Sequence, residues 1–189
     1  MSTREQQVAE AAIAVLADGG ARRLTHRAVD AAAGLPAGST SNLFRSRAEL
    51  IAGILGHMLA REEQAVTELS RSPMLTASKF GESELVAFLG ALIAEALGPG
   101  RRATQARRAL FAEAATDPVV AEQLLAASQY WFDLMSDLVS RAGGRDAHRR
   151  ARWLMAYADG LISDQLARPE ADFDPTAAIA PAVAGILRA

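Results

Sequence analysis

The sequence has 189 residues, of which half are hydrophobic and 22% are charged, and its formal net charge is −2 at pH 7. This composition predicts a folded chain with a sizeable core and argues against both a disordered protein and a uniformly basic nucleic-acid binder. Cysteine is absent, which excludes a disulfide framework, a thiol nucleophile and a cysteine-ligated metal site.

Helical spacing of apolar residues prevails along the chain, and convincing strand alternation is missing. The first predicted helix begins at a capping box formed by Ser2 and Glu5 and ends at the glycine pair 19–20. The second is capped by Thr25 and runs through Ala33. The predicted inner faces are Val8, Ala12, Val15 and Leu16 in the first helix, and Ala28, Val29 and Ala32 in the second.

A third, short helix is predicted to begin at Pro36, because the missing amide proton of proline costs nothing in a first helical turn. Residues 46–49, Ser-Arg-Ala-Glu, form another capping box, so a long fourth helix should start near Arg47 and run to about Leu69. Its predicted inward residues are Leu50, Ile54, Met58 and Ala65.

Residues 71–81 give the plainest loop of the chain, and five more helices follow it. Their predicted ranges are 85–96, 101–116, 118–142, 145–168 and 175–187. Glycine and proline clusters separate them. The sequence therefore predicts an all-α protein of about nine helices, without an internal repeat.

Positive charge gathers between Gly20 and Arg47, where five arginines face one acid, Asp30, for a local charge of +4 with histidine neutral. Two short helices joined by a glycine turn are the layout of a helix-turn-helix unit, whose second helix enters the DNA major groove. The small side chains of 38–41 suit close approach to DNA, and Asn42 can bind an adenine edge. A plain surface loop explains the same composition equally well.

Three motifs narrow this choice: Leu-Thr-His-Arg-Ala-Val at 24–29, Ala-Gly-Leu-Pro-Ala-Gly-Ser at 33–39, and Phe-Arg-Ser-Arg at 44–47 followed by Leu50. Together they resemble the N-terminal DNA-binding domain of the tetracycline-repressor (TetR) family, over roughly residues 8–59. The chain departs from the family pattern at 40–43, where Thr-Ser-Asn-Leu stands in place of leucine, two tyrosines and, often, histidine.

The resemblance implies a DNA-binding domain over 1–47 and a ligand-binding and dimerisation domain over 48–189. It also implies a homodimer that binds a double-stranded DNA operator and responds to a small-molecule effector. The expected DNA contacts are Thr25, His26, Arg27, Ala37, Gly38, Ser39, Ser41, Asn42, Arg45 and Arg47.

Apolar residues of the second predicted domain are candidates for two tasks. The candidate pocket residues, which would suit a hydrophobic or aromatic effector, are Phe88, Leu92, Phe111, Trp131, Met135 and Trp153. The candidate dimer-interface residues, on the last two helices, are Met155, Ala158, Leu161, Ile179, Val183 and Ile186. Burial in the core of a single chain is the alternative for both sets.

Signatures of catalysis are missing from the sequence. It has no Gly-x-Ser-x-Gly elbow, P-loop or dinucleotide fingerprint, and its three histidines are scattered, so we expect no enzyme, no cofactor and no metal site. No apolar run approaches the roughly 18 residues of a membrane span, so we expect a soluble, cytoplasmic protein. The prediction is a ligand-responsive repressor, with a helical enzyme and a protein-binding helical module as alternatives.

Overall fold

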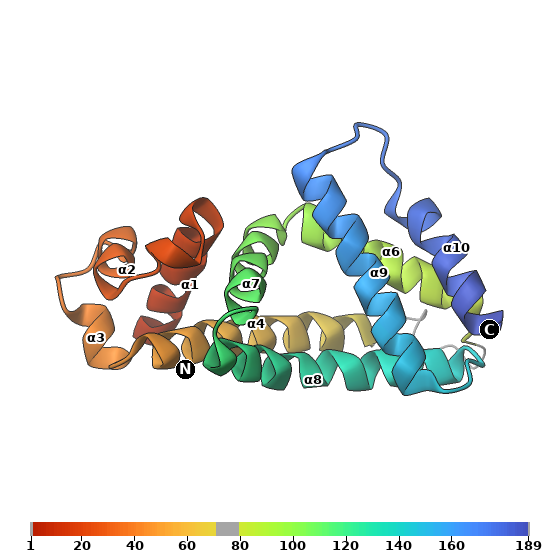
Figure 1. Cartoon of the computed structure of the whole chain (residues 1–189), viewed down its shortest axis with the longest axis horizontal. Coiled ribbons are helices and arrows are strands. Elements are labelled where there is room, and N and C mark those ends of the chain that lie inside the picture. The colour runs from red at the N-terminus through yellow and green to blue at the C-terminus, as the bar shows by residue number, and fades with distance from the viewer. Residues whose placement is uncertain (1, 71–79, 189) are drawn as a thin grey trace. The chain divides into compact units, whose positions relative to one another are not determined.

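The structure, a computed structural model, describes residues 2–70 and 80–188, with side chains included except for 65–70. Within these residues the chain forms nine α-helices and no strand, which confirms the predicted all-α class (Figure 1). The helices belong to two compact units, the first made of residues 1–65 and 101–128 and the second of residues 66–100 and 129–189.

The first unit contains the N-terminal helices and part of the middle of the chain. Its elements are α1 (Thr3–Gly19), the 3-10 turn η1 (Ala21–Arg23), α2 (His26–Ala33), α3 (Ser39–Leu43), α4 (Arg47–Ser70) up to residue 65, α7 (Arg101–Ala114) and the first turns of α8 (Pro118–Arg141). Apolar side chains of α1, α4, α7 and α8 share one core, which includes Leu16, Leu50, Ile54, Leu110 and Leu124.

The second unit consists of α6 (Glu82–Leu97), the remainder of α8, α9 (Ala147–Ala167) and α10 (Pro175–Arg188). Its core includes Phe88, Met135, Leu138, Leu154 and Ile179, all fully or almost fully buried. At Gly90 of α6 a Cβ atom would come within 3.0 Å of the Cα atom of Thr176, so α6 and α10 approach each other closely because residue 90 lacks a side chain.

Helix starts follow the predicted capping chemistry. Ser2 and Glu5 form the capping box of α1, and the Thr25 hydroxyl accepts the N–H of Ala28 (3.1 Å) at the start of α2. The carboxylates of Asp117 and Asp174 accept N–H groups in the first turns of α8 and α10, each with proline as the first helical residue. These helix starts can be predicted from the sequence because each capping side chain and the N–H group that it accepts are at most three residues apart.

Three local predictions need correction. The third helix begins at Ser39 rather than Pro36, because Gly38 adopts a left-handed conformation (φ 91°) that interrupts any helix started earlier. On α2 the buried residue beside Val29 is Asp30, whereas Ala32 is exposed. At the start of α4 the predicted capping box is half formed, because the Ser46 hydroxyl accepts the N–H of Glu49 (3.1 Å) while the Glu49 carboxylate accepts the N–H of Arg45, one residue before the predicted cap.

Two predictions lie outside the described part of the chain: the loop over 71–79 and the inward position of Ala65. In the described residues, no single helix has the length and apolar composition needed to cross a membrane. The pair α6 and α7 meets those criteria only when the two are joined across the break at 98–100.

Candidate functional site

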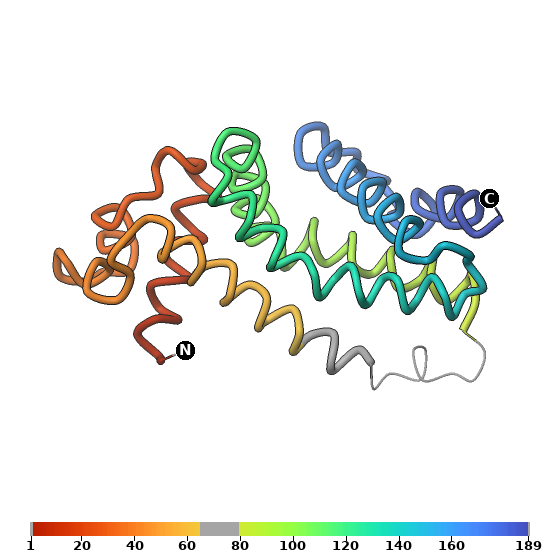
Figure 2. The backbone as a smooth tube through the Cα atoms, turned by 60° about the horizontal axis from the view of Figure 1, so that its bottom comes forward, coloured from red at the N-terminus to blue at the C-terminus, as the bar shows by residue number. Residues whose placement is uncertain are grey.

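The candidate DNA-binding site lies in the first unit, where α2, a glycine-containing turn and α3 form a helix-turn-helix (Figure 2). Gly34 ends α2 in the left-handed conformation (φ 66°), and the N–H of Leu35 donates to the carbonyl of Asp30 (2.9 Å). The chain then turns through Pro36 and Gly38 into the five-residue helix α3. Glycines at both bends therefore set the course of the chain between the two helices.

Asp30 joins α2 to the start of α3. Its carboxylate is almost completely buried and accepts hydrogen bonds from the N–H of Gly38 (2.8 Å) and from both the N–H (2.7 Å) and the hydroxyl (2.6 Å) of Thr40. Burial alone raises the pKa of this carboxyl, but the three hydrogen bonds favour the charged form and hold the pKa below its ordinary value. Asp30 is therefore a charged residue inside the fold.

His26 joins α2 to the end of α3. Its Nε2 atom lies 2.7 Å from the carbonyl oxygen of Phe44, and because a carbonyl only accepts, Nε2 carries the proton in this contact. The ring of Phe44 packs against Gly53 of α4, where a Cβ atom would collide with it. The end of α3 is thus fixed against α2 and α4 together.

Most of the predicted DNA contacts reach solvent. The exposed residues are Thr25, Arg27, Ala37, Ser41, Asn42 and Arg45, whereas His26, Gly38, Ser39 and Arg47 are partly buried. Within residues 2–70 and 80–188, the side chains of Arg27, Asn42 and Arg45 form no hydrogen bond or ion pair. The structure therefore gathers most of the predicted set on and around α3, with three polar side chains available to a ligand.

Arg47 differs from the other predicted contacts because its guanidinium is used inside the first unit. It donates to the carbonyl of Ala21 (2.9 Å) and pairs with Glu113 of α7 (2.8 Å). Next to it, the amide of Gln123 on α8 donates to the carbonyl of Ala48 (3.1 Å). The first turn of α4 is consequently held by both α7 and α8.

Sequence reasoning missed Asp30 and Thr40 as site residues. Asp30 counted only as the single acid of a basic stretch, and Thr40 only as a departure from the family pattern. One signal was available: His26 and Asp30 are four residues apart, so on a helix they share a face with each other and with Ala33. Which partners that face would meet depends on the fold of the following turn.

The six predicted pocket residues do not form one cavity wall. Phe88 and Met135 are buried in the core of the second unit, and Leu92 packs against that core. Trp131 is partly buried and Trp153 is 49% exposed, while Phe111 belongs to the first unit and is 48% exposed. Of these six residues only Phe88 and Met135 are fully enclosed, and both are part of the core of the second unit.

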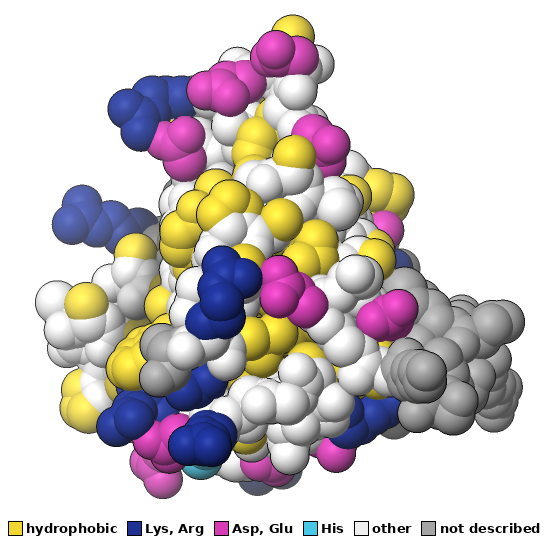
Figure 3. Space-filling view, turned by 90° about the vertical axis from the view of Figure 1, so that its right-hand side faces the viewer, with side chains coloured by type: hydrophobic (Ala, Val, Ile, Leu, Met, Phe, Trp, Pro, Cys, Tyr) yellow, Lys and Arg dark blue, Asp and Glu magenta, His cyan; other side chains and the backbone are white. Residues whose placement is uncertain are grey.

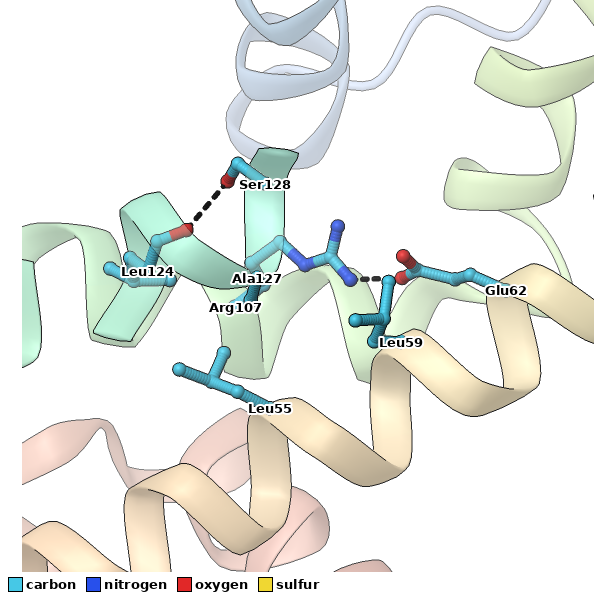
Figure 4. Close-up of a pocket in the computed structure, with 7 residues that line it drawn as sticks. All are labelled: Leu55, Leu59, Glu62, Arg107, Leu124, Ala127 and Ser128. Atoms are coloured by element: carbon cyan, nitrogen blue, oxygen red, sulfur yellow. Dashed lines mark hydrogen bonds and ion pairs between the residues drawn. The ribbon is translucent and has the colours of Figure 1, made fainter. Parts of the chain in front are cut away.

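A small pocket does occur in the first unit, lined by none of those six residues. Its lining is Leu55, Leu59, Glu62, Arg107, Leu124, Ala127 and Ser128, from α4, α7 and α8 (Figure 4). Arg107 reaches across it to an ion pair with Glu62. The free space accommodates roughly one water molecule, so in this conformation it holds no larger effector.

The predicted interface residues lie against the core of their own unit. Ile179 and Val183 are fully buried, and the partly buried Met155, Ala158, Leu161 and Ile186 pack against the same core. The opposite side of α9 is different, because its exposed residues include Trp153 (49%), Ala156, Tyr157 (44%) and Gly160.

These four residues recur at helical spacing, and we call them the outer stripe of α9. Arg149 lies over the ring of Trp153 at 5.3 Å. Figure 3 looks onto the second unit and shows hydrophobic side chains at its surface, with charged side chains around them. The outer stripe of α9 is therefore exposed, whereas the predicted interface residues pack against the core of the second unit. In the described residues, no group of three or more histidine and acidic side chains is placed to hold a metal ion.

The chain combines an N-terminal helix-turn-helix with a larger all-helical region, an arrangement used by helix-turn-helix transcriptional regulators. The family model described as "Tetracyclin repressor-like, C-terminal domain" matches residues 81–189, more than half of the sequence. The chain belongs to the TetR family. A search of curated proteins found no significant match.

Solved structures agree with this fold. A transcriptional regulator from Rhodococcus sp. Rha1 is 24% identical, with 99% of this chain and 97% of that chain covered and a TM-score of 0.75. A TetR-family member from Streptomyces coelicolor A3 is 24% identical, with 98% and 99% covered and a TM-score of 0.72. The multidrug binding protein EbrR in complex with ethidium is 24% identical, with 97% and 98% covered and a TM-score of 0.70.

Proposed function

We propose that the protein is a cytoplasmic transcriptional repressor that binds a palindromic operator as a homodimer, without a catalytic step of its own, and is released by a small hydrophobic or aromatic effector. The observation that carries the proposal is the surface around α3, where Ser41 and Asn42 are exposed and the arginines 27 and 45 have no partner within the described residues. Such a surface supplies hydrogen-bonding groups for base edges and positive charge for phosphates.

DNA recognition follows from the size of these side chains. α3 would enter the major groove, where the absence of large side chains at 38–41 brings the backbone close to the bases. The amide of Asn42 is suited to a bidentate contact with adenine, while Arg27 and Arg45 attract the phosphates on either side. Two such helices in a dimer would read half-sites about one helical turn, or a small multiple, apart.

Homodimer formation is supported by the outer stripe of α9. Trp153 and Tyr157 expose large aromatic surfaces beside the small residues Ala156 and Gly160, a combination that allows a second helix to approach closely. Two copies of this stripe, together with α10, would form a four-helix interface related by a two-fold axis.

Effector response is supported by the contacts at the first turn of α4. Glu113 on α7 holds Arg47, and Gln123 on α8 holds the carbonyl of Ala48. An effector that separates α4 from α7 and α8 would disturb these contacts at the end of α4 that follows α3. The small pocket has apolar walls and the Arg107–Glu62 pair, and EbrR, which has the same fold, was crystallised with ethidium and with proflavin.

The experiment is duplex binding by the wild type and by the double variant Arg27→Ala/Asn42→Ala at two salt concentrations, on genomic fragments selected by the wild type. We expect salt-dependent binding by the wild type and a loss of at least about 100-fold in the variant, because one phosphate contact and one base contact are removed from each protomer. Arg145→Ala, which removes an exposed arginine of the second unit, is the matched control and should bind like the wild type. A wild type that binds no fragment, or a double variant that binds as tightly as the control, contradicts the proposal.

A further inference from the structure

We propose that His26 and Asp30 form a two-point clamp that fixes α3 in its reading position, so that both are positioning residues for DNA recognition. This inference rests on the proposed function, because it concerns how α3 presents its side chains to DNA. The two residues are four apart on α2 and therefore lie on the same face of that helix. One of them contacts the beginning of α3 and the other contacts the carbonyl just past its end.

A clamp is needed because α3 is too short to be stable by itself. It has five residues, whereas isolated helices below about 12 residues are marginal in water, since nucleation costs more than one turn of hydrogen bonds returns. Its N-cap is Gly38, which has no side chain to accept the first N–H groups. The geometry of α3 must therefore come from its neighbours.

Asp30 supplies the missing acceptor at the beginning of α3. Its two carboxylate oxygens have different partners: Oδ2 accepts the N–H of Gly38, and Oδ1 accepts both the N–H and the hydroxyl of Thr40. The negative charge of Asp30 is also stabilised at this end, because the N–H groups of a helix start carry partial positive charge. Thr40 is fully buried, so the contact forms out of water, where charge-assisted hydrogen bonds are strong.

His26 supplies a donor at the opposite end. The protonated Nε2 atom satisfies the carbonyl of Phe44, which follows the last residue of α3. An acceptor at the start and a donor at the end are the two groups that a free helix lacks. The clamp therefore fixes the position of α3 along its own axis.

The clamp also fixes the rotation of α3. Successive residues of an α-helix are separated by about 100°, so turning Thr40 toward Asp30 turns Ser41 and Asn42 away from α2. The exposures agree, because Thr40 is fully buried while Ser41 and Asn42 are exposed. A contact inside the fold thus determines which side chains face the DNA.

The substitution Asp30→Asn changes DNA affinity in opposite directions depending on whether Asp30 acts by its charge on the DNA or by positioning α3. Neutralising an acid in a DNA-binding surface should strengthen binding at every sequence, because repulsion of phosphates falls. If Asp30 positions α3, the substitution Asp30→Asn weakens specific binding instead. The asparagine amide would point a donor at the N–H of Gly38, and the two donors would repel each other.

The test measures the ratio of specific to non-specific DNA affinity for four variants and the wild type, on a duplex that the wild type selects from a random pool. Asp30→Asn and His26→Leu each remove one half of the clamp. His26→Gln keeps an N–H donor and is the conservative rescue of His26→Leu. Glu63→Gln removes an exposed charge of the same unit and is the matched control. Circular dichroism at the measuring temperature establishes that each variant is folded.

We expect Asp30→Asn and His26→Leu to lower specific affinity at least about tenfold while non-specific affinity and its salt slope stay unchanged, because the phosphate contacts are intact. His26→Gln and Glu63→Gln should keep the wild-type ratio. Folded Asp30→Asn and His26→Leu proteins with the wild-type ratio overturn the clamp and leave the proposed function standing. If Asp30→Asn does not fold, the comparison of His26→Leu with His26→Gln decides. A wild type that selects no duplex overturns the proposed function, and the reading role of the clamp with it.

Discussion

Replacement of Asp30 by asparagine should destabilise the protein, because the buried carboxylate of Asp30 accepts three hydrogen bonds. The side chain keeps its volume and one carbonyl oxygen, which still accepts from Thr40, but it loses the acceptor for Gly38. A hydrogen bond to a charged group contributes about 1.5–3 kcal/mol. Part of this is offset because a neutral amide is less costly to bury than a carboxylate. We therefore expect Asp30→Asn to lower the free energy of unfolding by about 1–2 kcal/mol at neutral pH.

The same difference should depend on pH in a defined direction. The pKa of Asp30 is lower in the folded protein than its ordinary value of about 3.9, so its charged form stabilises the fold above that pH. As the pH falls below about 4 and through the folded-state pKa, the carboxyl takes up a proton and this stabilisation is lost. The variant has no group to titrate at this position. The gap between wild type and variant should therefore narrow in acid.

Urea unfolding followed by circular dichroism measures this, with both proteins at one fixed concentration because self-association changes apparent stability. Profiles are collected at pH 7 and at half-unit steps below pH 5. A gap of about 1–2 kcal/mol at pH 7 that shrinks toward pH 3 agrees with the buried, charged Asp30. Equal stability at pH 7, or a gap that stays constant with pH, refutes the reasoning.

Three further predictions concern other parts of the molecule. Gly90→Ala should destabilise the protein by about 1–2 kcal/mol, because the new methyl group meets α10. Gly56→Ala on the exposed side of α4, where a Cβ atom meets nothing within 4 Å, should stabilise it by up to about 1 kcal/mol. Thermal unfolding measures both, and a stabilised Gly90→Ala would contradict the close approach of α6 and α10. Arg47→Ala should lower stability by about 1–2 kcal/mol, since the partly buried Glu113 loses its partner, and should leave the salt slope of DNA binding unchanged. Arg45→Ala should instead reduce that slope by about 0.9 for each phosphate that is no longer neutralised. The reverse pattern would place Arg47 on the DNA. Gly160→Trp should convert the proposed dimer to a folded monomer in sedimentation, and a dimer of unchanged affinity would exclude the outer stripe of α9 as the interface.

Local chemistry explains which elements could be predicted from the sequence. The starts of α1, α2, α8 and α10 depend on a capping side chain and backbone groups within three residues, so the sequence contains all the information. The start of α3 does not, because its N–H groups are satisfied by Asp30, eight to ten residues earlier in the chain. Pro36 can begin a helix, but the left-handed conformation of Gly38, whose N–H binds Asp30, places the start of α3 at Ser39.

Within the candidate site, the sequence predicts correctly those polar side chains that are exposed simply because of their residue type. Arg27, Asn42 and Arg45 are exposed in the structure as expected. Arg47 is partly buried because Glu113, sixty-six residues later, provides an ion pair that no local pattern reveals. The stripes of the last two helices show the same limit, since periodicity identifies an apolar face without showing whether it packs within one chain or between two.

The most direct test of the central claim is selection of duplexes from a random pool by the wild-type protein, followed by sequencing. A homodimer that reads DNA through α3 predicts enrichment of one inverted repeat, with half-site centres separated by about 10 base pairs or a small multiple. It also predicts that Asn42→Ala loses preference at one symmetric pair of positions while the remaining positions are kept. A pool that stays random, or an enriched sequence without two-fold symmetry, would contradict the account.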